Sequence, residues 1–289
     1  MKQRMHSQHI NRSVWRAFAG VVAAVGAVLC GAARAAEEGD AVAREIAQCR
    51  QEGFPLMDLH VHLKGGLTLD DALQRSASNG IPYGIAVNGG LGFPVTNDAG
   101  IAAFADSLLG KPVWFALQAE GREWVRLFSP DAVARFDYVF TDAMTFTDER
   151  GRRTRLWIKE EVDIPDKQAF MDRYVAKIVE IVSREPIDIY VNATFLPACI
   201  AAEYDSLWTE ARMDAVIAAA RRHEVAIEIN ARYRIPSAAF IKRARQAGVK
   251  FTFGTNNSGP ELGRLEYCLE MRKACGLTAA DMFVPRRAL

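Results

Sequence analysis

The string Asp58-Leu59-His60-Val61-His62 is where residue type and spacing point most directly to chemistry. It continues an apolar run, and side chains two positions apart on a β-strand face the same side. His60 and His62 are therefore expected to project together from one rigid strand. Neutral imidazoles are common metal ligands, and two of them form half of a tetrahedral site. The string predicts a metal site or a direct contact with a substrate.

Seven apolar, strand-like runs alternate with amphipathic helical runs along the chain. Strands are expected at 56–59, 83–87, 113–119, 138–140, 187–191, 226–229 and 250–253. Helices are expected near 41–51, 69–79, 167–184, 210–224, 238–247 and 261–275, and most of them follow a Thr, Ser or Asp that can cap the first turn. Such alternation is typical of a parallel sheet with helices outside it, either a closed barrel or a doubly wound open sheet.

Polar residues stand where nearly every one of these strands is expected to end. A single one could belong to a solvated loop, but a polar residue at almost all seven strand ends favours one shared pocket. A barrel gathers the C-terminal ends of its strands into one mouth, whereas an open sheet binds ligands at one crevice. The pattern therefore predicts an α/β fold of the distorted (β/α)7 barrel kind. The polar residues are His60, His62, Asn88, Glu120, Asp142, Asn192, Glu228, Asn230, Asn256 and Asn257.

Cationic side chains accompany these polar residues. Guanidinium groups suit phosphate, sulfate or carboxylate, and asparagine amides suit hydroxyl groups, although each arginine could also be an ordinary loop charge. The combination predicts a small substrate that is anionic or rich in hydroxyl groups. The residues expected to bind it are Lys64, Asn88, Arg122, Asn192, Asn230, Arg232, Arg234, Asn256 and Asn257.

The His-x-His string resembles the first motif of the PHP (polymerase and histidinol phosphatase) superfamily, and the resemblance extends over about residues 54–283. Gln118-Ala119-Glu120 is similar to a family motif in which a glutamate bridges metal ions. The segments 137–139, 187–191, 226–230 and 251–263 fall where later family strands are expected. The resemblance implies a PHP-type barrel and a metal-dependent hydrolase, with His60, His62 and Glu120 as metal ligands.

The sequence departs from the family pattern at most of the other metal-binding positions. Neutral amides are weak metal ligands, and methionine is a poor substitute for histidine here. The chain has five histidines, of which only His60 and His62 lie in the motif. The remaining donors therefore predict one divalent ion (Zn, Mn or Fe) in place of the three that the family usually binds. The departures are Asn88, Met144, Asn192 and Asn256.

Three functions compete at this stage. The leading one is a phosphoesterase-like, metal-dependent hydrolase in which Asp142 or Glu228 serves as general base. The second is a non-catalytic periplasmic ligand-binding protein that kept the barrel and lost its metals. The third rests on the similarity of the segment 60–65 to the opening of adenosine deaminases. Those enzymes need eight strands and a further His-Ala-Gly-Glu element, and the sequence offers neither.

The N-terminus has the form of a secretory signal. Four basic residues precede an uncharged apolar run at 17–33, and Ala33-Arg34-Ala35 has the small-x-small form of a cleavage site. An uncleaved membrane anchor is the alternative. The pattern predicts a signal peptide at 1–35 and a single barrel domain at 36–289, periplasmic or secreted, with no membrane attachment after cleavage.

Cleavage would change the charge and the cysteine count. Residues 1–35 hold five of the 36 basic residues and no acidic one, which leaves 31 basic against 35 acidic residues. A slightly acidic chain without a basic block is not typical of nucleic-acid binding. The pattern does not specify an oligomeric state. Four cysteines remain and are expected to be buried thiols, with a disulfide such as Cys49–Cys199 left open; the four are Cys49, Cys199, Cys268 and Cys275.

Overall fold

The computed structural model describes residues 42–147, 150–287 and 289. The predicted signal peptide, residues 1–35, lies outside the described residues. The contacts separate the residues up to Gln48 from a compact unit, 49–289, which holds the barrel. Residues 42–51 are helical, close to the expected bounds. In the part of the chain that the structure describes, no helix is both long and apolar enough to cross a membrane.

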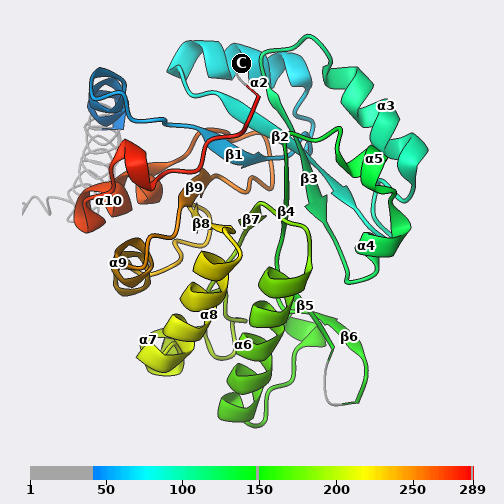
Figure 1. Ribbon diagram of the computed structural model, residues 1–289, viewed down its shortest axis with the longest axis vertical. Helices are drawn as coiled ribbons and strands as arrows, with labels where there is room; N and C mark the ends of the chain where they lie inside the picture. The colour runs from blue at the N-terminus through cyan, green and yellow to red at the C-terminus, as the bar shows by residue number, and fades with distance from the viewer. Residues whose placement is uncertain (1–41, 148–149, 288) are drawn as a thin grey trace, which may run out of the picture. The chain divides into compact units, whose positions relative to one another are not determined.

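Seven parallel strands of the unit 49–289 follow one another in chain order around one sheet (Figure 1). Each overlaps a strand expected from the sequence. The first and last strands also meet, because the Asn256 amide donates to the His60 carbonyl at 2.9 Å and the Thr255 amide donates to Asp58 Oδ1 at 2.9 Å. The fold is therefore a nearly closed (β/α)7 barrel, neither a doubly wound sheet nor an eight-stranded barrel. The strands are β1 (Asp58–Val61), β2 (Tyr83–Gly89), β3 (Trp114–Ala119), β4 (Tyr138–Thr141), β7 (Ile189–Tyr190), β8 (Ala226–Asn230) and β9 (Phe251–Gly254).

Helices cover the outside of the barrel (Figure 1). Four of them begin at a capping residue that the sequence predicts, because the side chains of Thr68, Asp166, Thr209 and Ser237 each accept a backbone N–H of the first turn. The helices are α2 (Leu69–Asn79), α3 (Asp98–Leu108), α4 (Trp124–Leu127), α5 (Pro130–Val133), α6 (Lys167–Arg184), α7 (Tyr204–Leu207), α8 (Glu210–Arg222), α9 (Ala238–Gln246) and α10 (Glu266–Cys275), with short 3₁₀ turns at Lys159–Glu161, Ala201–Glu203 and Ala279–Asp281.

Two helix bounds differ from the sequence prediction, which also missed α3 and the short helices α4 and α7. α10 begins five residues later than expected, since Gly263 adopts a left-handed backbone conformation (φ 66°) that a helix cannot contain. α8 ends at Arg222 because Glu224 is left-handed as well, with φ 57°. α3 was not predicted, because its run is rich in Ala and contains Gly, which obscures the amphipathic pattern.

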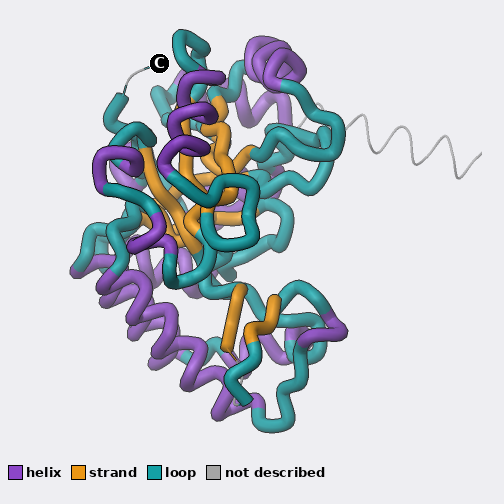
Figure 2. Tube along the Cα trace, turned by 90° about the vertical axis from the view of Figure 1, so that its right-hand side faces the viewer, coloured by secondary structure: helices purple, strands orange, loops and turns teal. Residues whose placement is uncertain are grey.

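An antiparallel hairpin of β5 (Thr145–Thr147) and β6 (Arg153–Arg155) follows β4, and the sequence did not predict it. Figure 2 shows that the hairpin and the loop leading to α6 stand apart from the strands of the barrel. The hairpin begins only a few residues after the C-terminal end of β4. It therefore brings the residues that follow it, Trp157 among them, to the mouth of the barrel.

Apolar side chains fill the barrel interior beneath the mouth. Such packing, with no room for solvent, is typical of barrels of this size. Polar residues take over only at the C-terminal strand ends, so the packed interior forms the base on which the site rests. The cluster consists of Met57, Leu59, Ala86, Trp114, Ala116, Tyr138, Phe140, Ile189, Val191 and Ala226, with Phe283 packed against it.

All four cysteines of the described chain are free. Cys49, Cys268 and Cys275 are buried, as expected. Cys199 is exposed, which corrects the expectation that all four are buried; it lies in the loop after β7, where an apolar sequence does not by itself decide which side chains are covered.

Candidate functional site

A cavity of about 320 Å³ opens at the C-terminal mouth of the barrel. Eight of the residues predicted for the site line it, although they come from all seven strand ends and their following loops. The strand-end pattern therefore does correspond to one pocket. The lining residues are His62, Lys64, Asn88, Phe93, Pro94, Gln118, Glu120, Asp142, Met144, Trp157, Asn192, Arg232, Tyr233 and Asn256.

Three further predicted residues lie at the base of this cavity. His60, Glu228 and Asn230 are almost fully buried. His60 Nδ1 lies 2.5 Å from Glu228 Oε1, across the barrel from β1 to β8. The other oxygen of Glu228 accepts hydrogen bonds from the Asn192 backbone N–H (3.0 Å) and from the Asn230 side chain (2.9 Å). Glu228 therefore holds the His60 ring in place from below.

The remaining three predicted residues do not line the cavity. The Arg122 guanidinium donates to Glu185 at 2.8 Å and to Thr141 Oγ1 at 2.9 Å, which keeps it outside the site. Arg234 is exposed and pairs with Glu270 at 2.7 Å.

Asn257 has a structural role in the loop after β9. Its side-chain oxygen accepts the His62 backbone N–H at 2.8 Å, and its amide donates to the His62 carbonyl at 2.8 Å and to the Gly259 carbonyl at 2.7 Å. Asn257 therefore fixes the end of β1, from which His62 projects.

The two imidazoles lie side by side, with ring centroids 5.2 Å apart. His62 Nδ1 lies 3.1 Å from the Ala86 carbonyl oxygen, which can only accept, so this nitrogen carries the proton. His60 Nδ1 faces Glu228 in the same manner. Both rings thus direct Nε2 away from the acceptors that anchor them, and His60 Nε2 is buried without a hydrogen-bond partner. Burial, then the neighbouring His60 and Lys64, hold the pKa of His62 well below its usual value, so its ring is neutral.

Each of the three acidic side chains in the site accepts a hydrogen bond from an asparagine amide. Asn88 donates to Glu120 Oε1 at 2.7 Å, Asn192 donates to Asp142 Oδ2 at 2.8 Å, and Asn230 donates to Glu228. Asn192 in turn accepts from Asn230 at 3.0 Å and from Asn256 at 3.2 Å. Asn192, Asn230 and Asn256 therefore form a buried hydrogen-bonded network with Asp142 and Glu228, whereas Asn88 and Glu120 form a separate, partly buried pair.

Burial is also the main electrostatic influence on Glu120 and Asp142. Burial, followed by the charge of Asp142, raises the pKa of Glu120 to about 8. Burial raises the pKa of Asp142 as well, and the hydrogen bonds from the Met144 N–H and from Asn192 offset part of this effect. Two adjacent buried carboxyl groups cannot both ionise without a compensating cation.

Two asparagines of the network have an unusual backbone conformation. Asn192 (φ 53°) and Asn256 (φ 48°) are left-handed, a region that most residues with a side chain avoid but asparagine tolerates. Each lies two residues after the C-terminal end of a strand, β7 or β9. Conformations of this kind concentrate at functional sites, where neighbouring contacts hold them in place.

The described residues contain no group of three or more His, Cys, Asp or Glu side chains arranged to hold a metal ion. The donor chemistry still fits one ion in part. An acceptor on Nδ1 is the usual way in which a protein orients a metal-binding imidazole, and the unpartnered His60 Nε2 is the atom that such an ion would take. The carboxylate of Glu120, by contrast, is occupied by Asn88. The predicted ligand set stays a prediction.

The sequence analysis missed several residues of the cavity. Gln118 lies two positions before Glu120 on β3 and faces the same side, which is a signal that could have identified it. Tyr233 and Trp157 come from loops, for which the sequence has no periodic signal.

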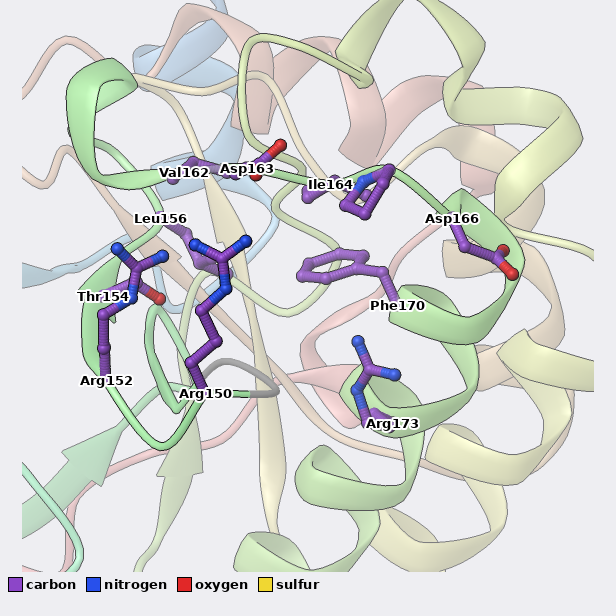
Figure 3. Close-up of a pocket in the computed structure, with 11 residues that line it drawn as sticks. Arg150, Arg152, Thr154, Leu156, Val162, Asp163, Ile164, Asp166, Phe170 and Arg173 are labelled. Atoms are coloured by element: carbon purple, nitrogen blue, oxygen red, sulfur yellow. The ribbon is translucent and has the colours of Figure 1, made fainter.

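A separate, smaller cavity of about 70 Å³ lies by the β5–β6 hairpin and the start of α6 (Figure 3). Arg150, Arg152 and Arg173 line it. It contains none of the residues predicted for the site.

No family model and no curated protein matches this chain. Among solved structures, histidinol phosphate phosphatase (HISK) from Lactococcus lactis subsp. lactis Il1403, solved with zinc, L-histidinol and phosphate, is similar at a TM-score of 0.57 and 13% sequence identity. The match covers 80% of this chain and 95% of that chain. The chain therefore has the barrel fold of that phosphatase, in agreement with the PHP-type barrel expected from the sequence.

Proposed function

We propose that this chain is an exported, phosphoesterase-like hydrolase that acts on a small anionic or hydroxyl-rich molecule with one divalent metal ion. The pair of buried imidazoles is the observation that supports the proposal most. Each presents Nδ1 to a fixed acceptor, and His60 Nε2 is left buried with no partner. The fold similarity to a phosphatase solved with zinc and phosphate supports the same chemistry.

The site residues have distinct roles in this proposal. His60 and His62 hold the ion, and Glu120 joins them after its side chain leaves Asn88. The ion, when bound, supplies Lewis acidity and lowers the pKa of water. Asp142 lines the cavity and takes a proton as general base. Glu228 is 1% exposed and hydrogen-bonded beneath His60, so we assign it the orientation of that ring in place of a general-base role.

Two cations support an anionic substrate. Lys64 and Arg232 both line the cavity, and they lie close enough that the charge of Arg232 contributes to lowering the pKa of Lys64, after burial. A phosphoryl group placed between them would relieve this repulsion. Charged hydrogen bonds from Lys and Arg to phosphate are among the stronger ones in proteins.

A non-catalytic ligand-binding protein is the second candidate. The hydrogen bonds from asparagines to all three carboxylates favour it, because a neutral amide stands beside each acid and Asn88 occupies the one that a metal ion would need. In this case the cavity binds an anion or a polyol without converting it. Metal content separates the two candidates.

Elemental analysis of the purified protein after incubation with zinc, manganese or iron tests the proposal. We expect about one equivalent of metal and metal-dependent release of phosphate from an aryl phosphate ester. His60→Ala and His62→Ala should each abolish metal binding and lower kcat/KM by at least ~100-fold. His223→Ala is the matched control, because His223 is exposed at the end of α8. A protein that takes up no metal supports the ligand-binding function instead, and three equivalents would contradict the role assigned to the asparagines.

Export is part of the same proposal, and it rests on the basic head, apolar run and Ala33-Arg34-Ala35 exit of the N-terminus. We expect cleavage after Ala35 and recovery of the product outside the cytoplasm. N-terminal sequencing that finds Met1 on a membrane-bound product would contradict this part.

A further inference from the structure

A second cavity of about 330 Å³ adjoins the site cavity at the mouth of the barrel. Three residues, Trp157, Arg232 and Tyr233, line both. The site cavity is bordered by carboxylates, amides and cations. The second is bordered on one side by the apolar segment after β7, which includes Phe195, Leu196 and Pro197. A ligand bound in the site therefore has an apolar surface directly beside it.

Aromatic rings form much of this surface. The Phe195 and Tyr233 rings pack edge to face with centroids 4.9 Å apart, which fixes the Tyr233 ring. The Arg232 guanidinium lies 5.2 Å above the Tyr233 ring, so its charge stands at the border between the two cavities. Trp157 is 44% exposed and lines both cavities, so its indole is accessible to a molecule that spans them.

We propose that this second cavity binds an aromatic or other flat apolar group of the same small molecule whose anionic group lies at Lys64 and Arg232. This inference rests on the proposed function and narrows it to organic monoesters with an apolar alcohol part, as opposed to sugar phosphates. The shared lining supports this proposal, because Trp157, Arg232 and Tyr233 border both cavities and one molecule can contact all three. The charge of Arg232 also supports the proposal. Because Arg232 lies between the two cavities, the anionic group of the ligand would bind on one side of it and the apolar group on the other.

Trp157 is the specificity-determining residue in this arrangement. It follows β6, so the hairpin inserted after β4 brings it to the mouth. An indole offers a large, rigid face at low cost in side-chain entropy, which suits stacking with an aromatic ring. We assign it no role in bond cleavage or in binding the anion, so its loss should change the selection of ligands without changing the anion site.

Isothermal titration of the full chain with benzylphosphonate and methylphosphonate, with and without zinc, tests the proposal. Both probes carry the same non-hydrolysable anion and differ only in the aromatic group. We expect the wild type to bind benzylphosphonate about tenfold more tightly than methylphosphonate. Trp157→Ala should remove most of this preference and leave the affinity for methylphosphonate unchanged, which also shows that the variant is folded. Trp157→Phe should retain most of the preference.

The control variant is Leu109→Ala, which removes a 72% exposed apolar side chain at the end of α3 and should change neither affinity. Equal affinity of the wild type for the two probes, or an unchanged preference in Trp157→Ala, overturns the apolar subsite and leaves the proposed function standing. Failure of both probes to bind the wild type overturns the anion site, and the subsite with it.

Discussion

The two ends of the barrel use acidic side chains in different ways. At the N-terminal end, Asp137 and Asp188 directly precede β4 and β7. Asp137 accepts the Phe115 backbone N–H at 2.7 Å, and Asp188 accepts the Val139 backbone N–H at 2.8 Å. Each carboxylate thus satisfies a donor at the start of the neighbouring strand. These acids complete the backbone hydrogen bonding of the barrel.

At the mouth, Asp142 and Glu228 also accept one backbone N–H each, but every acid of the site in addition accepts a hydrogen bond from an asparagine side chain. Glu120 and Asp142 accept amide hydrogens of Asn88 and Asn192, and both carboxyl groups have a raised pKa. The buried atoms His60 Nε2 and Gln118 Oε1 also lie at this end and have no hydrogen-bond partner. An unsatisfied buried polar atom costs about 1–3 kcal/mol.

The difference indicates that the acids at the N-terminal end stabilise the fold, whereas those at the mouth belong to a binding site. Every polar group discussed at the N-terminal end has a partner supplied by the chain, so its role is complete in the folded protein. The mouth keeps unused hydrogen-bonding capacity and repelling acids at a cost in stability, which is the usual property of a site built for a ligand. Exchanging Asn and Asp at each end tests this contrast.

The largest effect is expected from Asn192→Asp at the mouth. The new carboxylate would face Asp142 in a site where the two residues are 2% and 9% exposed, with the donated hydrogen bond lost. We expect the free energy of unfolding of the metal-free protein to fall by on the order of 3 kcal/mol. Zinc should restore part of this loss, because the two carboxylates then have a cation between them. Urea unfolding in EDTA and in zinc measures both quantities.

Asn97→Asp is the matched control for that substitution. Asn97 is exposed and caps α3 through a hydrogen bond from the Gly100 N–H at 2.9 Å. Aspartate caps a helix about as well as asparagine, so the change should stay within about 0.5 kcal/mol. If Asn192→Asp in EDTA is as stable as the wild type, the neutral amide of Asn192 is not what stabilises Asp142 in the absence of a metal ion. The contrast between the two ends of the barrel would then be wrong.

A smaller effect is expected from Asp188→Asn at the other end of the barrel. Burial raises the pKa of Asp188, and the Val139 N–H and Arg286 offset this effect in part. The folded protein therefore holds the proton more tightly than the unfolded chain. Asp188 then favours folding most below the ordinary carboxyl pKa of 3.8, and this contribution is lost as the pH rises through the pKa in the folded protein.

The asparagine variant lacks that titration but keeps an oxygen that can accept the Val139 N–H. Relative to the wild type, its free energy of unfolding should increase from about pH 4 upwards and then level off, with a total change on the order of 1 kcal/mol. Urea unfolding at several pH values between 3.5 and 7 provides the measurement. Parallel pH profiles for the two proteins would show that Asp188 has no part in the pH dependence of stability.

The sequence by itself determined the barrel and the position of its mouth. Alternating apolar runs predict seven strands because the side-chain period of each element is a local property, and the caps at Thr68 and Ser237 are local signals too. The spacing of His60 and His62 placed both imidazoles at one strand end for the same reason. The strand order also predicts that the polar residues at the other strand ends lie close together, because neighbouring parallel strands bring their C-terminal ends to the same edge of the sheet.

Only the tertiary structure decided which of those side chains are available to a ligand. Arg122 resembles a substrate-binding cation in the sequence, but Glu185, more than sixty residues away, draws it into an ion pair outside the site. The asparagines pair with acids on neighbouring strands, and a hairpin without a periodic pattern delivers Trp157 to the mouth. Such contacts depend on strand register and on loop paths, which a local pattern does not encode because the partners meet only after the barrel has formed.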